Sequence, residues 1–363
     1  MKRLIIHILG IFLALPAVAG EGSGPTPLDD NHLLGPAQLI DNLTIFPVFA
    51  KKPSEFKEVI SLTHALKDGQ AEIRELGAQT GPIRQGSSSQ VQAQPQVLDG
   101  AQVGTLVIEN KGKKHILVLA GTVLYGGKQD RLVAQDFVVG PESTIPVGAF
   151  CIEQGRWTGN RMGQTTNGKF GAMEQLATTS VRKAGQYKGN QGMVWANVSK
   201  VNAYNMVSSS SGTLFATLDD EHVKAQRETI AKKIRAHLQA SGKEKNLVGL
   251  AYAIDGKVSG VRWFLNKQIF TEFRDTIIHT AAVDSITAQA RARQAEKKRV
   301  TAPAKPEDVA AFVENLRSVK VSQRNITSGL NVNEIRVTEK GFKQDCKMID
   351  AFPDPITTDF LAE

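Results

Sequence analysis

Five apolar residues follow one another at positions 116–120, in the middle of the chain. A short apolar run of this kind is typical of a strand that is covered on both faces. Gly126 and Gly127 then interrupt the pattern, because glycine tolerates the positive φ of tight turns. Two more strands are predicted at 131–139 and 144–153, joined by the turn-forming sequence Gly-Pro-Glu-Ser. The pattern therefore predicts a central antiparallel hairpin.

Elsewhere the pattern groups hairpins apart from helices. Asp255-Gly256 is a strong hairpin signal, and Asn266 is placed to cap a long helix. Further strands are expected at 43–49, 72–76, 105–109, 332–338 and 342–349. Further helices are expected at 61–68, 169–183, 191–203, 221–239 and 308–316, and a polar surface loop at 79–96. This grouping predicts an α+β fold in which antiparallel, hairpin-rich sheets pack with helices.

The open end of the central hairpin collects the polar residues that a fold alone does not require. If Val139 faces Thr144, then Asp130 faces Glu153, with Cβ atoms roughly 5 Å apart. The segments GGKQDR and EQGRW then share one neighbourhood. The candidate ligand-binding residues there are Gly126, Gly127, Lys128, Gln129, Arg131, Gln154, Arg156 and Trp157.

Two interpretations of this cluster stay open. In the first, Asp130 and Glu153 are a catalytic pair whose mutual repulsion raises one pKa, while the glycine N–H groups and the cations bind a polar or anionic ligand. Gln191 and Trp195 join that pocket if their helix packs on the hairpin. In the second, Asp130 pairs with Arg131, Glu153 pairs with Arg156, and Trp157 covers them.

Several standard sites are absent from the sequence. Residues 122–129 lack the Ser or Thr that follows the lysine of a phosphate loop, and there is no dinucleotide fingerprint or nucleophile elbow. The seven histidines lack paired metal-ligand spacing. The sequence therefore predicts neither a metal nor a cofactor.

The same two segments also carry a family resemblance. GGKQDR followed by IPVGAFCIEQGRW resembles the domain family named for its association with ADP-ribosylglycohydrolases and rhodanese-phosphatases. Weaker similarity lies at 190–198, 209–214 and 248–264, so that the resemblance covers roughly residues 39–290 and, more weakly, the C-terminal part. It implies a role in handling metabolites derived from NAD or ADP-ribose. It also implies a cysteine at position 151 in intracellular relatives, and we therefore expect Cys151 and Cys346 to be unpaired.

The first nineteen residues have the pattern of a secretory signal. Lys2 and Arg3 precede the apolar run 4–15, and Ala17-Val18-Ala19 matches a cleavage site. The run is too short for a transmembrane helix, and no later segment is long enough. We expect a periplasmic or secreted protein.

Net charge is +8, but residues 288–305 alone hold six basic residues against one acidic residue. A single basic tract without interleaved aromatic residues is typical of a solvated surface, so no nucleic-acid partner is expected. The expected organisation is a signal peptide at 1–19, a principal α+β domain at 28–290, a basic connector at 291–305, and a C-terminal helix-hairpin extension at 306–352 packed on the principal domain.

The leading hypothesis is an exported domain that recognises a small polar or phosphorylated metabolite, nucleotide- or ADP-ribose-like by the resemblance, with hydrolysis left open. The alternative is a non-catalytic envelope interaction module that binds glycans or a protein partner.

Export leads to the first prediction. Mass spectrometry of the protein from its native source should find an N-terminus near Gly20, because cleavage follows Ala19. Recovery of the chain from the cytoplasm with Met1 in place would contradict it.

Overall fold

The structure is a computed structural model that describes residues 24–56, 58–76, 104–241, 246–296, 302–349, 351 and 353–363. The expected signal peptide at 1–19 and the expected loop at 79–96 lie outside the described residues, as does part of the basic connector. Among the residues described, no helix is both long enough and apolar enough to cross a membrane.

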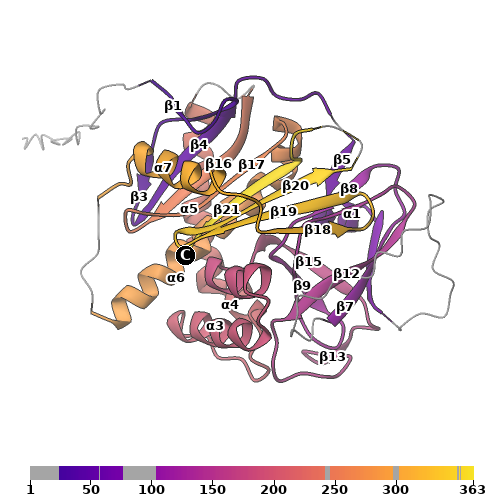
Figure 1. The fold of residues 1–363 in the computed structure, drawn as a ribbon. Helices are drawn as coiled ribbons and strands as arrows, with labels where there is room; N and C mark the ends of the chain where they lie inside the picture. The colour runs from indigo at the N-terminus through magenta and orange to yellow at the C-terminus, as the bar shows by residue number, and fades with distance from the viewer. Residues whose placement is uncertain are drawn as a thin grey trace, which may run out of the picture.

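The large sheet runs through the centre of the molecule, and its strands all pair antiparallel (Figure 1). It contains strands from both ends of the chain, because β1 (Thr26–Pro27) and β21 (Thr357–Ala362) both belong to it. Its order is β1 (Thr26–Pro27), β2 (His32–Leu34), β4 (Leu43–Ala50), β16 (Leu247–Ile254), β17 (Lys257–Phe264), β21 (Thr357–Ala362), β20 (Gly341–Met348), β19 (Asn331–Thr338) and β18 (Gln323–Thr327), with β3 (Gln38–Ile40) beside β4. The expected C-terminal extension thus supplies strands of this sheet, and the domain division stays a prediction.

The second sheet carries the central motifs. Its order is β15 (Phe170–Leu176), β9 (Thr122–Gly126), β10 (Arg131–Val133), β12 (Thr144–Cys151), β7 (Gly104–Asn110) and β6 (Ala71–Glu75). A three-stranded sheet of β11 (Phe137–Val139), β8 (His115–Val118) and β5 (Val59–Ser61) lies next to it, with β5 and β8 parallel. A separate hairpin joins β13 (Asn160–Arg161) to β14 (Gln164–Thr165).

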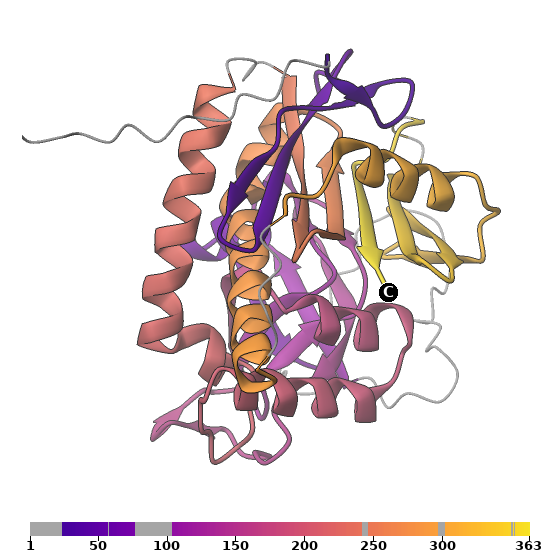
Figure 2. The ribbon, with the colours of Figure 1, turned by 90° about the vertical axis from the view of Figure 1, so that its left-hand side faces the viewer.

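Helices cover both faces of the large sheet (Figure 2). On one face α5 (Glu221–Ala240) and α6 (Lys267–Gln294) bury apolar stripes, while α7 (Pro306–Arg317) packs on the other face. Asn266 caps α6 as expected, accepting a hydrogen bond from the N–H of Ile269 at 2.9 Å. Because α6 contacts both β16 and β15, it holds the two sheets together. The shorter helices are α1 (Leu62–Lys67), α2 (Thr179–Arg182), a π-helical turn (Lys183–Tyr187), α3 (Gln191–Tyr204) and α4 (Phe215–Asp219).

The α+β class is confirmed, with 32% helix and 36% strand. The prediction of a helix at 169–183 is wrong for its first half. These residues form β15, which pairs with β9 at the edge of the second sheet. That segment contains good helix formers (Ala, Met, Glu, Gln and Leu), so pairing with a distant strand overrides local propensity.

The central hairpin also differs from the expectation. Residues 131–139 split into β10 and β11, and β11 pairs with β8 instead of β12. The break lies at Asp136, whose carbonyl accepts hydrogen bonds from Asn331 and Asn333 of β19. A contact some two hundred residues away in the chain therefore ends the strand.

A buried ion cluster links the C-terminal strand to the rest of the fold. Asp359 of β21 accepts a hydrogen bond from Nε of Arg262 at 3.1 Å and one from Arg182 of α2. Burial favours the protonated form of Asp359, but the two guanidiniums outweigh it and lower the pKa of this carboxyl.

Replacing Asp359 by Asn should destabilise the fold by about 3 to 5 kcal/mol, because two buried guanidiniums lose their nearest carboxylate partner. The exposed pair Glu314–Arg317 is the control, and Glu314→Gln should cost about 0.5 kcal/mol or less. Since the folded pKa is depressed, the contribution of Asp359 should be complete above about pH 3.9 and be lost as pH falls further. Urea unfolding of both variants measures this, and equal stability of the two would refute it.

Candidate functional site

The turn after β9 requires both of its glycines. Gly126 has φ of 134° and Gly127 has φ of 45°. A Cβ at Gly126 would lie 2.3 Å from the carbonyl oxygen of Lys169, and one at Gly127 would lie 2.1 Å from the ring of Phe170. The backbone groups of this turn are already used within the protein. The N–H of Gly126 donates to Asp130 at 3.0 Å, and the N–H of Gly127 donates to Lys169 O at 2.9 Å.

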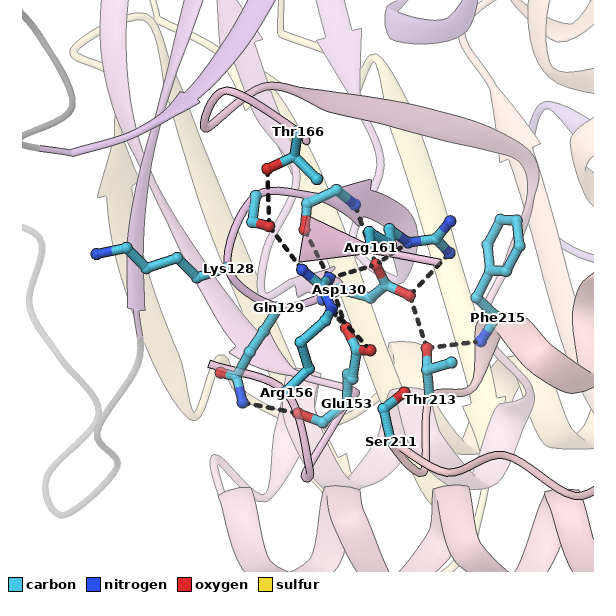
Figure 3. Close-up of polar contacts among 12 residues, drawn as sticks. Lys128, Gln129, Asp130, Glu153, Arg156, Arg161, Thr166, Ser211, Thr213 and Phe215 are labelled. Atoms are coloured by element: carbon cyan, nitrogen blue, oxygen red, sulfur yellow. Dashed lines mark hydrogen bonds and ion pairs between the residues drawn. The ribbon is translucent and has the colours of Figure 1, made fainter. Parts of the chain in front are cut away.

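Asp130 is fully buried, and both of its carboxylate oxygens accept hydrogen bonds from neighbouring donors (Figure 3). Its Oδ1 accepts hydrogen bonds from Gly126 N, from Nη2 of Arg156 at 3.3 Å and from Nε of Arg161 at 3.0 Å. Its Oδ2 accepts from Nη2 of Arg161 at 3.2 Å and from the hydroxyl of Thr213 at 2.7 Å. This carboxylate therefore has no free position for a ligand.

Glu153 and Arg156 complete the cluster. Oε2 of Glu153 accepts from the N–H of Asp130 at 2.8 Å and from Nη2 of Arg156 at 2.7 Å, while Oε1 accepts from Nε of Arg156 at 2.9 Å. Nη1 of Arg156 donates to the carbonyls of Gly127 and Thr158, and Nη2 also reaches that of Gly126. We call Asp130, Glu153, Arg156 and Arg161 the carboxylate–guanidinium lock. Its two negative and two positive charges balance.

The lock brings Asp130 and Glu153 together, but in a different register from the one expected. Arg131 is level with Cys151, and Asp130 is therefore level with Ile152 instead of Glu153. The Glu153 side chain reaches back to the Asp130 backbone. The catalytic interpretation predicted that repulsion between the two carboxylates raises one pKa, and the pKa of Glu153 is not raised. Its burial favours the protonated form, but hydrogen bonds from Arg156, Ser211 and the Asp130 N–H lower the pKa below its usual range.

The other predicted residues fall into two groups. Gln129 and Arg131 are buried: the Gln129 amide donates to the Glu153 carbonyl at 2.8 Å, and Arg131 contacts the sulfur of Cys151. Arg131 thus does not pair with Asp130, whose ion-pair partners are Arg156 and Arg161. Gln154 and Trp157 are exposed, Trp157 by 64%, so the indole does not cover the cluster.

Helix α3 packs against the end of β12, as the pocket hypothesis required. The side chain of Gln191 accepts from the N–H of Cys151 at 2.9 Å and donates to its carbonyl at 2.7 Å. Gln191 therefore supports the strand end. Cys151 and Cys346 are both free and buried, as expected.

The sequence analysis did not identify three residues of the site, which are Arg161, Phe215 and Tyr125. Arg161 belongs to the lock, and its guanidinium carbon lies 4.1 Å from the ring centre of Phe215 and 5.4 Å from that of Tyr125. The only local signal at Arg161 is the turn-forming sequence Asn-Arg-Met-Gly, which says nothing about its partners.

A cavity of about 330 Å³ lies beside the lock. It is lined by Glu75, Leu76, Lys128, Gly159, Thr166, Asn167 and Gly168. Lys128 is exposed, and its side chain points away from the lock (Figure 3). Its backbone N–H donates to the Glu75 carboxylate at 2.8 Å, which holds the Lys128 backbone beside the cavity. Within the described ranges, no group of three or more His, Cys, Asp or Glu residues is placed to hold a metal ion.

Comparison with protein-family models matches residues 31–353 to the model ARPP-1, described as the ARG and Rhodanese-Phosphatase-superfamily-associated Protein domain. No curated protein and no solved structure matches the chain. The match includes the lock, the cavity and the strands β18–β20, and it extends past both ends of the range that the sequence motifs indicated.

The geometry of the lock predicts a structural role for its carboxylates. Asp130→Asn and Glu153→Gln should each lower the free energy of unfolding by about 3 kcal/mol, because each leaves buried guanidinium charge uncompensated. The contribution of Glu153 should be complete above about pH 4.3 and be lost as pH falls through its depressed folded pKa.

Thermal and urea melts provide the measurement. The matched control is Asp275→Asn, which removes a half-exposed partner of Arg235 and should cost about 0.5 kcal/mol or less. If both lock variants instead keep wild-type stability, the carboxylates are not structural partners, and the result favours the catalytic interpretation.

Proposed function

This chain belongs to the ARPP-1 family, and from that premise we propose that it recognises a small phosphorylated metabolite of the nucleotide or ADP-ribose type in the cavity beside Lys128. The family match covers nearly the whole described chain. The class of ligand comes from the family resemblance, and the location comes from the arrangement of charges around the cavity.

The observation that carries the proposal is the division of the cations into two sets. Arg156 and Arg161 are committed to buried carboxylates. The ammonium group of Lys128 makes no ion pair with another described residue and stands at the cavity. A lysine ammonium is a flexible point charge that suits phosphate, and a cavity wall nearby strengthens its field.

The size of the cavity narrows the ligand further. Small-molecule sites range from about 300 to 1,000 Å³, so this one is at the low end. A ribose phosphate or a mononucleotide is the better match, and only part of an ADP-ribose molecule would be enclosed. Glu75, Thr166 and Asn167 line the same space and provide polar groups for ribose hydroxyls.

Hydrolysis by Asp130 and Glu153 is not part of the proposal. Neither residue lines the cavity, and both carboxylates are occupied by donors. A general acid or base must reach the proton that it transfers.

We propose recognition in the periplasm or outside the cell, supported by the charged, apolar and small-residue pattern of residues 1–19.

Isothermal titration with AMP, ADP-ribose, ribose 5-phosphate and unphosphorylated adenosine tests the proposal. The phosphorylated compounds should bind and adenosine should bind more weakly. Lys128→Ala should weaken the binding of AMP by about tenfold, the equivalent of one charge-assisted hydrogen bond, without changing the melting temperature.

The matched control is Lys232→Ala, which removes an exposed lysine on α5, distant in sequence from the cavity residues. It should leave AMP binding unchanged. Failure of all four compounds to bind, or equal loss of affinity in both variants, would reject the proposal and favour the glycan- or protein-binding alternative.

A further inference from the structure

The hairpin at residues 158–168 is attached to the rest of the protein mainly at its base. Strands β13 and β14 pair only with each other. At the base, Thr166 donates through its hydroxyl to the carbonyl of Gly127 at 3.0 Å, and Arg156 donates to that of Thr158. At the tip, Gly163 makes the turn with φ of 81°, and Met162 is 85% exposed.

Between base and tip, one side chain connects the hairpin to the body of the protein. Within the described residues, Arg161 makes all the hydrogen bonds and ion pairs that join positions 160–165 to residues outside the hairpin. Its contact is bidentate, with Nε and Nη2 directed at the two oxygens of Asp130. The position of the outer part of the hairpin therefore depends on this residue.

Arg161 enters a slot that suits a guanidinium group. Phe215 of α4 and Tyr125 of β9 are 5.1 Å apart between ring centres, and the guanidinium stacks closest on Phe215, at 4.1 Å. Asp130 closes the end of the slot. A planar, delocalised cation with a fork of donors fits aromatic faces and a carboxylate at once, which an ammonium does not.

The slot is held in place independently of its occupant. The hydroxyl of Thr213 donates to Asp130 and accepts from the N–H of Phe215 at 3.1 Å. Asp130 also keeps Arg156 and the N–H of Gly126. Removing the Arg161 side chain therefore leaves the carboxylate partly compensated and the slot formed.

The hairpin is also a wall of the cavity. Gly159 from its first leg and Thr166, Asn167 and Gly168 from its second leg line the space opposite Glu75 and Lys128. These residues belong to the attached base, since Thr166 donates to the carbonyl of Gly127 and the carbonyl of Gly168 accepts from the N–H of Glu75.

We propose that Arg161 is the latch of the 158–168 hairpin, a positioning residue held in a guanidinium-specific slot of Phe215, Tyr125 and Asp130, and that its release frees the outer part of the hairpin at 160–165. The latch and its slot do not depend on the function proposed above. When the latch is released, the slot is open to a guanidinium cation from solution.

Hydrogen–deuterium exchange measures the latch without any metabolite. Arg161→Ala should speed amide exchange at 160–165 by about tenfold or more, from the loss of an ion pair and a cation–π contact together, and leave α5 unchanged. Arg161→Lys should restore slow exchange only in part, because lysine keeps the positive charge but lacks the forked donors of the guanidinium. Phe215→Leu should also speed exchange at 160–165, although Asp130 and Arg161 are both present.

Chemical rescue tests the specificity of the slot. Millimolar ethylguanidinium should raise the melting temperature of Arg161→Ala, and ethylammonium should do so less. Ethylguanidinium should not slow amide exchange at 160–165 in this variant, because the added cation is not linked to the hairpin. Arg235→Ala, which removes a surface arginine paired with Asp275, should not respond to ethylguanidinium.

Unchanged exchange at 160–165 in Arg161→Ala would overturn the latch, and equal rescue by the two cations would overturn the guanidinium slot. Because neither readout contains a phosphorylated compound, both are separate from the failure of AMP to bind.

Discussion

The guanidinium of Arg156 is the group on which the rest of the site depends. It joins the carbonyls of the Gly126–Gly127 turn to Glu153 and Asp130, and it is only 9% exposed. A buried cation of this kind is tolerated only when its donors and its charge are satisfied. Satisfying Arg156 consumes both carboxylates that the sequence offered as a catalytic pair. It also fixes the turn from which Lys128 projects to the cavity.

Much of the fold and part of the site could be predicted from the sequence. Local signals such as Asp255-Gly256 and the Asn266 cap predicted the hairpin and the helix that the structure contains. The two central segments do meet, since turn chemistry and alternation place them on adjacent strands. Their register was not predictable, because contacts of Asp136 with β19 break the strand, and those contacts have no local signature. Arg161 was missed for the same reason: its partners come from β9 and α4, and only the folded chain brings them together.

The lock also explains how a strongly charged cluster and a ligand site can lie side by side without sharing residues. Four charges cancel in the buried cluster, so that its field outside is weak, whereas the exposed ammonium of Lys128 forms no ion pair within the part of the chain that the structure describes. The buried cluster holds the Gly126–Gly127 turn in position, and the exposed Lys128 attracts the phosphorylated ligand. The hairpin that carries Arg161 belongs to both, since its base lines the cavity and its side chain enters the cluster.

A crystal structure of the protein with AMP tests this division most directly. We expect phosphate density within hydrogen-bond distance of Nζ of Lys128, bounded by Thr166 and Asn167, with Arg161 still paired to Asp130. Density for the ligand bonded to the carboxylate of Asp130 or Glu153, with Arg156 or Arg161 displaced, would contradict it and identify the buried carboxylates as the functional groups.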